Sequence, residues 1–281
     1  MNVEPIIRLE NATKRYGGIA ALEGASFDLY PGEVHALVGE NGAGKSTLCK
    51  LVAGVIAPSE GVLKVGGQVV NFSAPKDARR HGISMVYQET SLVPQLTVAQ
   101  NIVLGRERAF NSVRKVRNAA RQVLQRLNFN MDPSQLAGSL SAAKRQMVEI
   151  ARAVLNDARV IILDEPTAAL TPEETEHLFA LMKSLQQRGV GIIFISHALE
   201  EALTHADRIT VLRNGRITVT GPAAQFDRAR LIHHMIGDEV KDRPDAPVAG
   251  RRRTSALPVL QVENIRMSNV VNNMSFSIFP G

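Results

Sequence analysis

The chain has 281 residues, of which 44% are hydrophobic and 21% charged, which is typical of a globular protein with one or two domains. Its net charge of +6 suits an anionic partner (a nucleotide, a nucleic acid or a membrane surface) or reflects only a mildly basic surface. The single cysteine, Cys49, excludes an intramolecular disulfide and fits a reducing compartment. Because no signal peptide is visible and no stretch approaches the roughly 20 apolar residues that span a bilayer, any membrane role is expected to be peripheral.

Short apolar runs alternate with helical patterns, which predicts an α/β fold. Near the N-terminus, antiparallel strands joined by turns are expected at residues 6–11, 25–30, 61–67 and 68–72. Four nearly continuous apolar runs follow, at residues 34–39, 83–88, 160–165 and 191–196. Runs of this kind are typical of strands buried on both faces of a sheet.

Between about residues 91 and 157 the strand signals disappear, so a helical subdomain is expected to be inserted in the α/β core. Thr97 is expected to cap one helix that ends at Gly105. Residues 111–129 predict a second helix, with an apolar stripe made of Val113, Val116, Ala120, Val123 and Leu127. Its other face carries five basic residues, Arg114, Lys115, Arg117, Arg121 and Arg126, which most simply form a solvated surface.

The sequence LSAAKRQ, residues 140–146, predicts a further helix capped by Ser141. Lys144 and Arg145 fall in its first turn, where the helix dipole disfavours positive charge. Either this position is simply not optimised, or an anion binds at that end of the helix.

The C-terminal part of the chain repeats pieces of the N-terminal part. Residues 258–264 (PVLQVEN) resemble residues 5–11 (PIIRLEN), and residues 275–281 (SFSIFPG) resemble residues 26–32 (SFDLYPG). Self-similarity on this scale predicts that a second copy of the same domain begins at 258–281, after a charged, proline-bearing linker at 238–257. Lacking most of its partners, this segment is expected to pack poorly.

Residues 39–47, GENGAGKST, fit the phosphate-binding P-loop pattern between a predicted strand and a predicted helix. Backbone N–H groups of such a loop hold phosphates, and its glycines let the backbone bend around them. The residues concerned are Gly39, Glu40, Asn41, Gly42, Ala43, Gly44, Lys45, Ser46 and Thr47. The pattern assigns the β and γ phosphates to Lys45 and Mg²⁺ to Ser46.

Polar side chains follow three of the predicted buried strands. Asp164 is placed to hold Mg²⁺, and Glu165, next to it, to accept a proton from the attacking water. His197 and Gln88 end two other strands, and the ends of parallel strands meet at one edge of a sheet. Taken singly, a histidine or an acid at a strand end is more often structural. The P-loop upstream favours the functional interpretation.

The motifs, in the order KRYGG, GENGAGKST, YQE, LSAAKRQMVEIARAV, VIILDEP and ISH, resemble the ATP-binding cassette (ABC) ATPases over residues 4–237. The resemblance implies a P-loop NTPase fold with an antiparallel β subdomain and an inserted helical subdomain. It also implies that Tyr16 stacks on adenine and that Gln88 senses the γ-phosphate or metal. Residues 140–144, with Ser141, Ala142 and Ala143, would contact ATP bound on the opposite cassette.

Longer stretches, such as RQMVEIARA and EPTAALT, are similar to the ribose/galactose-type monosaccharide importers. This similarity implies an ATPase that uses ATP and Mg²⁺ at the cytoplasmic face of the bacterial membrane. Its partners would be permease subunits, through them a solute-binding protein, and a second cassette, with no nucleic acid. Alternatives are a soluble tandem-cassette ATPase acting on the ribosome, which the short linker disfavours, and an inactive truncated remnant. DNA-repair cassettes carry long coiled coils that are not seen here.

Two positions depart from the general family pattern. Thr171 stands where aspartate is usual, and the sequence TPEE predicts that it caps a helix with Pro172 at the first position and Glu174 completing a capping box. Ala142 and Ala143 replace glycines of the usual LSGGQ sequence, so each adds a Cβ where close approach to a phosphate is expected.

Overall fold

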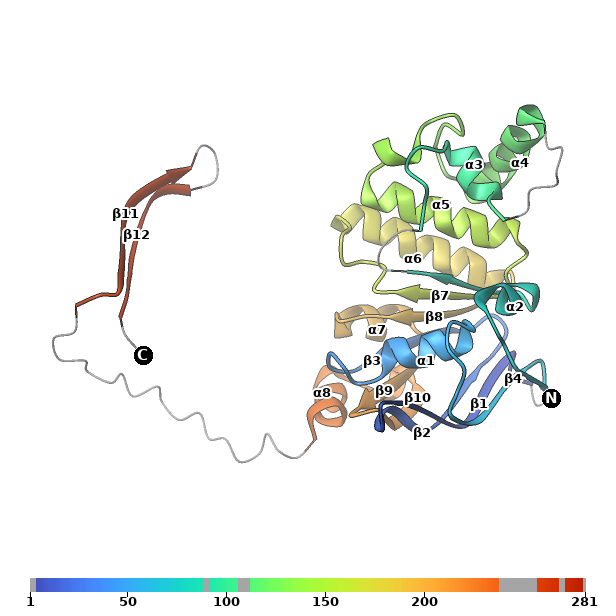
Figure 1. The fold of residues 1–281 in the computed structure, drawn as a ribbon, viewed down its shortest axis with the longest axis horizontal. Helices are drawn as coiled ribbons and strands as arrows, with labels where there is room; N and C mark the ends of the chain where they lie inside the picture. Colours follow the sequence, from blue (N-terminus) through green and yellow to red (C-terminus); the bar gives the residue numbers. More distant parts are fainter. Residues whose placement is uncertain (1–3, 88–90, 106–111, 238–256, 268–270, 280–281) are drawn as a thin grey trace. The chain divides into compact units, whose positions relative to one another are not determined.

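The computed structural model describes residues 4–87, 91–105, 112–237, 257–267 and 271–279 (Figure 1). The chain forms two compact units, Met1–Asp238 and Glu239–Gly281. None of the helices in the described ranges is long and apolar enough to cross a bilayer.

A six-stranded sheet in the order β10-β9-β3-β8-β7-β6 forms the centre of the first unit. Its strands are β3 (Val34–Val38), β6 (Ile83–Val86), β7 (Val160–Asp164), β8 (Gly191–Ile195), β9 (Arg208–Arg213) and β10 (Arg216–Pro222). All are parallel except β10, which is antiparallel to β9. The four predicted apolar strands are confirmed. They are almost entirely apolar because alternate residues enter two different cores, as fully buried Ile193 and Phe194 do.

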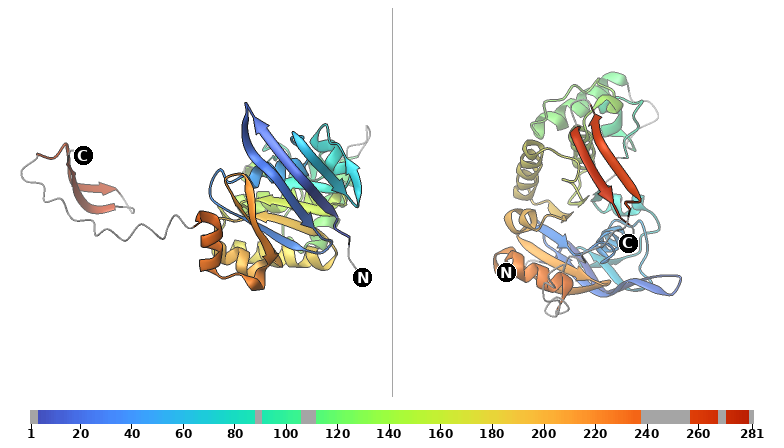
Figure 2. Two further views of the ribbon diagram at one scale, coloured as in Figure 1. Left: turned by 90° about the horizontal axis from the view of Figure 1, so that it is seen from below. Right: turned by 90° about the vertical axis from the view of Figure 1, so that its left-hand side faces the viewer.

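A four-stranded antiparallel sheet, in the order β2-β1-β4-β5, confirms the other predicted strands (Figure 2). Its members are β1 (Ile7–Tyr16), β2 (Ile19–Leu29), β4 (Glu60–Val65) and β5 (Gln68–Val70). Helix α1 (Lys45–Val52) shares one core with this sheet and with one face of the central sheet. Helix α2 (Pro75–Arg80) follows β5 and leads into β6.

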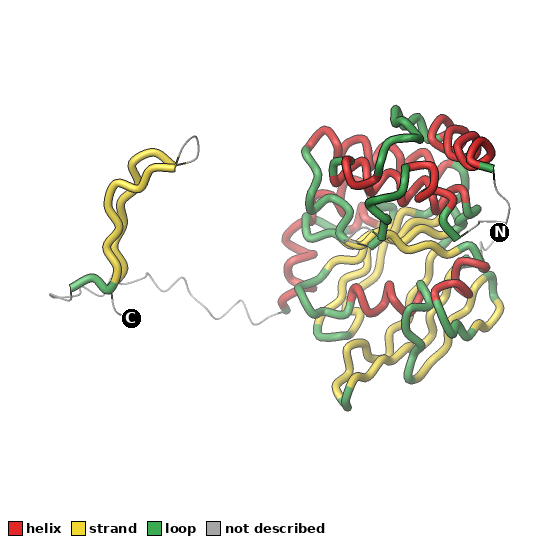
Figure 3. Tube along the Cα trace, turned by 45° about the horizontal axis from the view of Figure 1, so that its top comes forward, coloured by secondary structure: helices red, strands yellow, loops and turns green. Residues whose placement is uncertain are grey.

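The remaining helices pack on the other face of the central sheet (Figures 1 and 3). They are α5 (Ala142–Leu155), α6 (Pro172–Gln187), α7 (Leu199–His205) and α8 (Arg228–Ile236), with α3 (Val98–Val103) and α4 (Val113–Arg126) beyond α5. Two short 3₁₀ turns lie at Ala137–Ser139 and Ala223–Gln225. The predicted helical insertion therefore consists of α3, α4 and α5.

Side-chain caps begin these helices as the sequence predicts. Thr97 and Thr171 each form a capping box, and the Ser141 hydroxyl accepts a hydrogen bond from the Lys144 N–H at 3.4 Å. On α4 the predicted apolar stripe is buried or half-buried except at Val113, which is 82% exposed. Because Val113 is the first residue of the helix, it lies beyond the surface that packs. The five basic residues of α4 are all exposed, as predicted.

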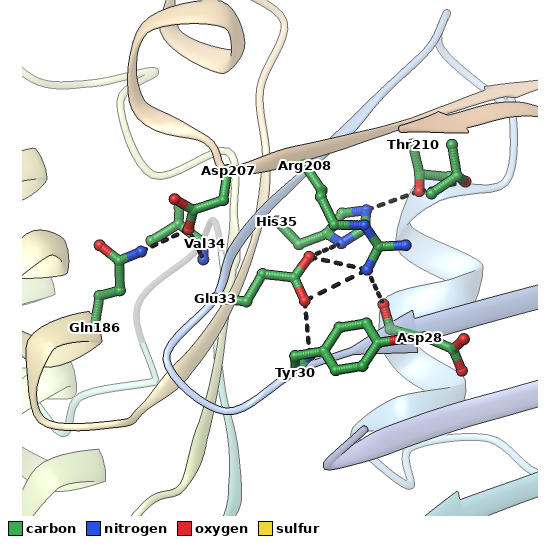
Figure 4. A network of polar contacts seen from close by, with 10 residues as sticks. Asp28, Tyr30, Glu33, Val34, His35, Gln186, Asp207, Arg208 and Thr210 are labelled. Carbon is green, nitrogen blue, oxygen red and sulfur yellow. Dashed lines mark hydrogen bonds and ion pairs between the residues drawn. The ribbon is translucent and has the colours of Figure 1, made fainter. Parts of the chain in front are cut away.

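A buried polar network surrounds the start of β3, the strand that leads to the P-loop (Figure 4). The Glu33 carboxylate accepts hydrogen bonds from the Tyr30 N–H at 2.7 Å and from Arg208 Nη1 at 3.1 Å. Since a carboxylate only accepts, His35 Nδ1, 2.8 Å from Glu33 Oε1, carries a proton, and His35 Nε2 then accepts from the Thr210 hydroxyl at 2.8 Å. The network joins β3 to β9 by side chains as well as by their backbones.

Acid is expected to weaken this network through His35. Burial lowers the pKa of His35, against the opposing effect of Glu33, so the folded chain holds a neutral imidazole. As the pH falls below the ordinary histidine value, the unfolded chain takes up this proton before the folded chain does. Between about pH 7.5 and about pH 5.5, the free energy of unfolding should therefore fall by about 1 kcal/mol through His35. Guanidinium unfolding of the wild type and of a His35→Gln variant in the same buffers measures this difference. If the free energy of unfolding changed equally with pH in the wild type and in the variant, the prediction would be contradicted.

In the second unit, β11 (Leu260–Met267) and β12 (Val271–Ile278) form an antiparallel hairpin that reproduces β1–β2. The pair Val262↔Phe276 corresponds to Leu9↔Phe27, and both hairpins have a register shift just after that pair. Asn264 has a φ of 55°, matching 48° at Asn11. The apolar side chains differ in environment, because Phe276 is 42% exposed and Phe27 only 3%.

Candidate functional site

The P-loop leaves the end of β3 and turns into α1. Gly39, Gly42 and Gly44 have φ values of 151°, 81° and 104°, so the backbone bends where the sequence predicts. A Cβ at Gly39 would collide with the carbonyl oxygen of Leu212, and one at Gly44 would lie 2.9 Å from that of Ala21. The first N–H groups of α1 have no carbonyl within the helix to bond, so this end of the helix is suited to an anion.

Lys45 is the buried cation of this loop, with 6% of its surface exposed. Its Nζ donates hydrogen bonds to the carbonyl oxygens of Gly39 at 2.8 Å and Glu40 at 3.0 Å. Burial lowers the pKa of Lys45, and the nearby charges of Glu165 and Asp164 oppose that shift. The side chain therefore curls back over the loop, where it can reach a phosphate held there.

Two acids and a histidine lie at the same edge of the central sheet. Asp164 ends β7 beside Ile195, the last residue of β8, which in turn pairs with Leu37 of β3. Burial, followed by the charge of Glu165, raises the pKa of Asp164. Glu165 has a φ of 50°, and its Oε1 lies 2.6 Å from Nε2 of His197. The fold thus joins Lys45, Asp164, Glu165 and His197 in one polar site.

The other predicted residues take several positions. Ser46 and Thr47 are half-buried in the first turn of α1, next to Ala43 and Gly44, which are buried, whereas Glu40, Asn41 and Gly42 are exposed. Tyr16 is 50% exposed at the end of β1, and Ala21 of the adjoining β2 lies against the P-loop at Gly44. Gln88 lies outside the described residues.

A pocket of about 520 Å³ opens beside the acidic pair. Asp164 and Glu165 line it together with Tyr87 and with Ala142 and Arg145 from the start of α5. Ser141 is exposed next to the pocket's Ala142, and Ala143 is buried in the core. The Cβ of Ala143 is therefore packed inside the protein in this structure and does not face the pocket. In the described chain the Nε of Arg145 is buried without a hydrogen-bond partner.

The chemistry of these donors fits a nucleoside triphosphate with Mg²⁺. A helix N-terminus and a buried lysine suit phosphates, and a serine hydroxyl with a carboxylate suits a hard cation. Among the described residues no cluster of three or more histidine, cysteine or acidic side chains could hold a metal alone.

Sequence reasoning missed two further polar groups of the first unit. One is the network of Glu33, His35 and Arg208 below β3, signalled only by a histidine inside an apolar run. The other is the pair of Glu149 and Arg152 on α5, whose charges fall on the buried side of the helix. Glu149 and Arg152 lie within the RQMVEIARA stretch, whose pattern does not signal that they are shielded from solvent.

The profile of the ABC transporter family matches residues 22–168, which is more than half of the chain. The ribose import ATP-binding protein RbsA 2 of Rubrobacter xylanophilus is 49% identical over 238 residues, covering 83% of this chain and 46% of that protein. RbsA of Rhodococcus jostii, also a ribose import ATP-binding protein, is 43% identical over 282 residues, covering 99% of this chain and 55% of that protein. The chain therefore spans about half the length of the curated relatives it matches.

Solved structures give the same result for the fold. A nucleotide-free ATP-binding cassette from an ABC transporter superposes with a TM-score of 0.73 at 25% identity, covering 84% of this chain and all of that one. CbiO1 of Clostridium perfringens, part of an ABC transporter complex, gives 0.72 at 26% identity over 82% of this chain and 93% of that one. With the P-loop, the acidic pair and the histidine on one sheet edge, these matches show that the chain belongs to the ABC transporter family of ATP-binding cassettes.

Proposed function

We propose that this chain is part of the ATP-hydrolysing subunit of an importer that takes up a monosaccharide or a sugar-like solute. The observation that carries this proposal is the convergence of the P-loop lysine, the acidic pair and His197 at one edge of the central sheet. The sugar assignment is supported by relatives named as ribose import ATP-binding proteins. The ribosome-acting and inactive alternatives have no observation in their favour.

In this proposal Lys45 and the first-turn N–H groups of α1 bind the phosphates of ATP, and exposed Tyr16 stacks on the adenine. Ser46 and Asp164, with Gln88, would hold Mg²⁺, which would supply positive charge to offset that of the phosphates. Glu165 accepts the proton of the attacking water, while His197 orients the Glu165 carboxylate through the 2.6 Å contact. Ser141 and Ala142 face ATP bound by a second cassette, whereas the predicted third residue, Ala143, is buried behind them.

The partners follow from the same proposal. A second cassette shares the site, and the hairpin β11–β12, with the register of β1–β2, is the start of one. The subunit works at the cytoplasmic face of the bacterial membrane, peripherally, on permease subunits that receive solute from a binding protein. It has no nucleic-acid partner.

Replacing Lys45 by alanine is expected to weaken ATP binding at least about tenfold and to abolish solute uptake, since the phosphates lose their buried cation. Nucleotide binding and uptake of labelled ribose or galactose are measured with the full-length protein and its permease. Lys183→Ala, an exposed lysine of α6, is the matched control. Recovery of the wild-type protein with ribosomes, and not with membrane subunits, would overturn the proposal.

A further inference from the structure

The side chain of Glu201, in the first turn of α7, connects the two loops that carry the acid and the histidine of the site. Its Oε2 atom accepts a hydrogen bond from the Thr167 hydroxyl at 3.1 Å and another from the Ser196 hydroxyl at 2.6 Å. Thr167 follows Glu165 by two residues after β7, and Ser196 directly precedes His197 after β8. One carboxylate oxygen therefore joins the two loops, and we call these two hydrogen bonds the Glu201 clamp.

On the β7 side, the clamp holds a turn that has an uncommon backbone conformation. Glu165 has a φ of 50°, a left-handed conformation that residues with a side chain seldom keep unless surrounding contacts hold it. The Ala168 N–H donates to the Glu165 carbonyl at 3.4 Å, and the Leu170 N–H donates to the Thr167 carbonyl at 3.1 Å. Because Thr167 belongs to this turn, a bond that fixes Thr167 also fixes the direction in which Glu165 leaves β7.

On the β8 side, the clamp holds the turn that contains His197. Ser196 is 2% exposed, and its hydroxyl has one proton and two acceptors within reach, Glu201 Oε2 at 2.6 Å and the Ala198 carbonyl at 3.0 Å. The shorter contact, to a charged oxygen, is the stronger one, so the proton points to Glu201. The Ala198 N–H donates to the same hydroxyl at 3.0 Å. Since His197 lies between Ser196 and Ala198, the hydroxyl fixes both ends of its turn.

Glu201 differs from the neighbouring acid of the same helix. Glu200 is exposed and pairs with Arg228 at 2.7 Å. Glu201 is half-buried, and none of the ion pairs among the described residues includes it. Partial burial of a carboxylate is unfavourable, and two hydroxyl donors offset it less than a cation would. The position of Glu201 is therefore better explained by the loops that it holds than by a gain in stability.

We propose that Glu201 is a positioning residue for ATP hydrolysis, which holds the Glu165 carboxylate against the His197 imidazole. Glu165 Oε1 and His197 Nε2 lie 2.6 Å apart although their side chains come from separate loops. A displacement of about 1 Å in such a pair can lower a rate about 100-fold. Glu201 acts through these two residues, because its hydrogen bonds reach Thr167 and Ser196. The roles of Glu165 and His197 rest on the proposed function, whereas the clamp rests on its own hydrogen bonds.

Replacing Glu201 by leucine is expected to lower the kcat of ATP hydrolysis by about 10- to 100-fold and to leave the affinity for ATP nearly unchanged. Leucine removes the shared acceptor, which releases both loops. Glu201→Gln should restore most of the rate, because an amide oxygen in the place of Oε2 accepts from both hydroxyls. The matched control is Glu200→Leu, the same change at the exposed acid next to it, which should hydrolyse ATP at the wild-type rate. Single-turnover hydrolysis and equilibrium ATP binding are measured on the full-length protein with its permease.

Thr167→Val tests whether the effect passes through the clamp. Valine keeps the shape of threonine but cannot donate to Glu201 Oε2. The double variant Glu201→Leu/Thr167→Val should therefore lose about as much rate as Glu201→Leu alone, since the second change removes a bond that is already absent. Rates are expressed per bound ATP, so that unfolded protein does not count as a loss of positioning.

Three results would overturn the proposal: a normal kcat in Glu201→Leu, a Glu201→Gln protein as slow as the leucine variant, or losses that multiply in the double variant. If Glu201→Leu weakened ATP binding as much as it lowered kcat, Glu201 would shape the nucleotide site as a whole, and the proposal would also be wrong. The proposed function is tested separately. If Glu165→Gln and His197→Ala left hydrolysis unchanged, the roles given to those residues would fail, whatever the result at Glu201.

Discussion

Replacing Glu165 by glutamine is expected to lower the kcat of ATP hydrolysis by about 100- to 10,000-fold and to leave ATP binding intact. Glutamine keeps the shape of the side chain and can still meet His197 Nε2, which lies 2.6 Å from Glu165 Oε1. It cannot take a proton from the attacking water. Single-turnover hydrolysis and equilibrium ATP binding, measured on the full-length protein with its permease, separate the two effects.

The control for this change is Glu176→Gln, which neutralises an exposed acid on α6 without touching the site. Its hydrolysis rate should match the wild type. A Glu165→Gln protein that hydrolyses ATP at the normal rate would remove Glu165 from the role of proton acceptor. A large loss of ATP binding would instead mean that Glu165 holds the P-loop in place.

Replacing Glu33 by alanine should lower the free energy of unfolding by about 3–5 kcal/mol, the range found when one partner of a buried ion pair is removed. Burial alone would raise the pKa of Glu33, but hydrogen bonds from His35 and the Tyr30 N–H, with the charge of Arg208, lower it overall. The carboxylate is thus held ionised by partners that would all lose their acceptor. Denaturant unfolding followed by circular dichroism measures the loss.

The matched control is Glu23→Ala, because the Glu23 carboxylate pairs with Arg216 at 2.9 Å while 41% exposed. An exposed pair of this kind contributes at most about 1 kcal/mol. If both variants lost the same free energy, burial would not be what makes the Glu33 network important. The expected fall should also grow smaller toward acid, where Glu33 itself becomes protonated.

Much of the fold follows from local sequence. The runs at β3, β7 and β8 are nearly continuous in apolar residues because both faces of the sheet are covered, so they stand out without knowledge of their neighbours. Thr171 and Glu174 specify the start of α6 within four residues. The P-loop is equally local, since Gly39, Gly42 and Gly44 adopt the backbone angles that their spacing predicts.

The rest depends on contacts between distant parts of the chain. Glu33 meets Arg208 across the sheet, 175 residues away in sequence, and no local pattern predicts that pairing. The periodicity of α4 places Val113 on the apolar stripe, but Val113 is the first residue of the helix and is 82% exposed, which periodicity alone does not predict. Glu149 and Arg152 look like ordinary helix surface residues until Ser91 and Asn101 are brought against them.

The shared register of the hairpins β1–β2 and β11–β12 also bears on how the chain folds. β4 pairs with β1, and β11 resembles β1 in sequence and in its pairing with the strand that follows it, so β11 is a competitor for the place of β1 beside β4 during folding. Order of synthesis and loop closure both oppose this exchange. Domains emerge N-terminus first, and β1 is roughly a quarter as far from β4 in sequence as β11 is, a closure advantage of about 1 kcal/mol. Proximity along the chain therefore favours the pairing of β4 with β1 over its pairing with β11, independently of how well the side chains fit.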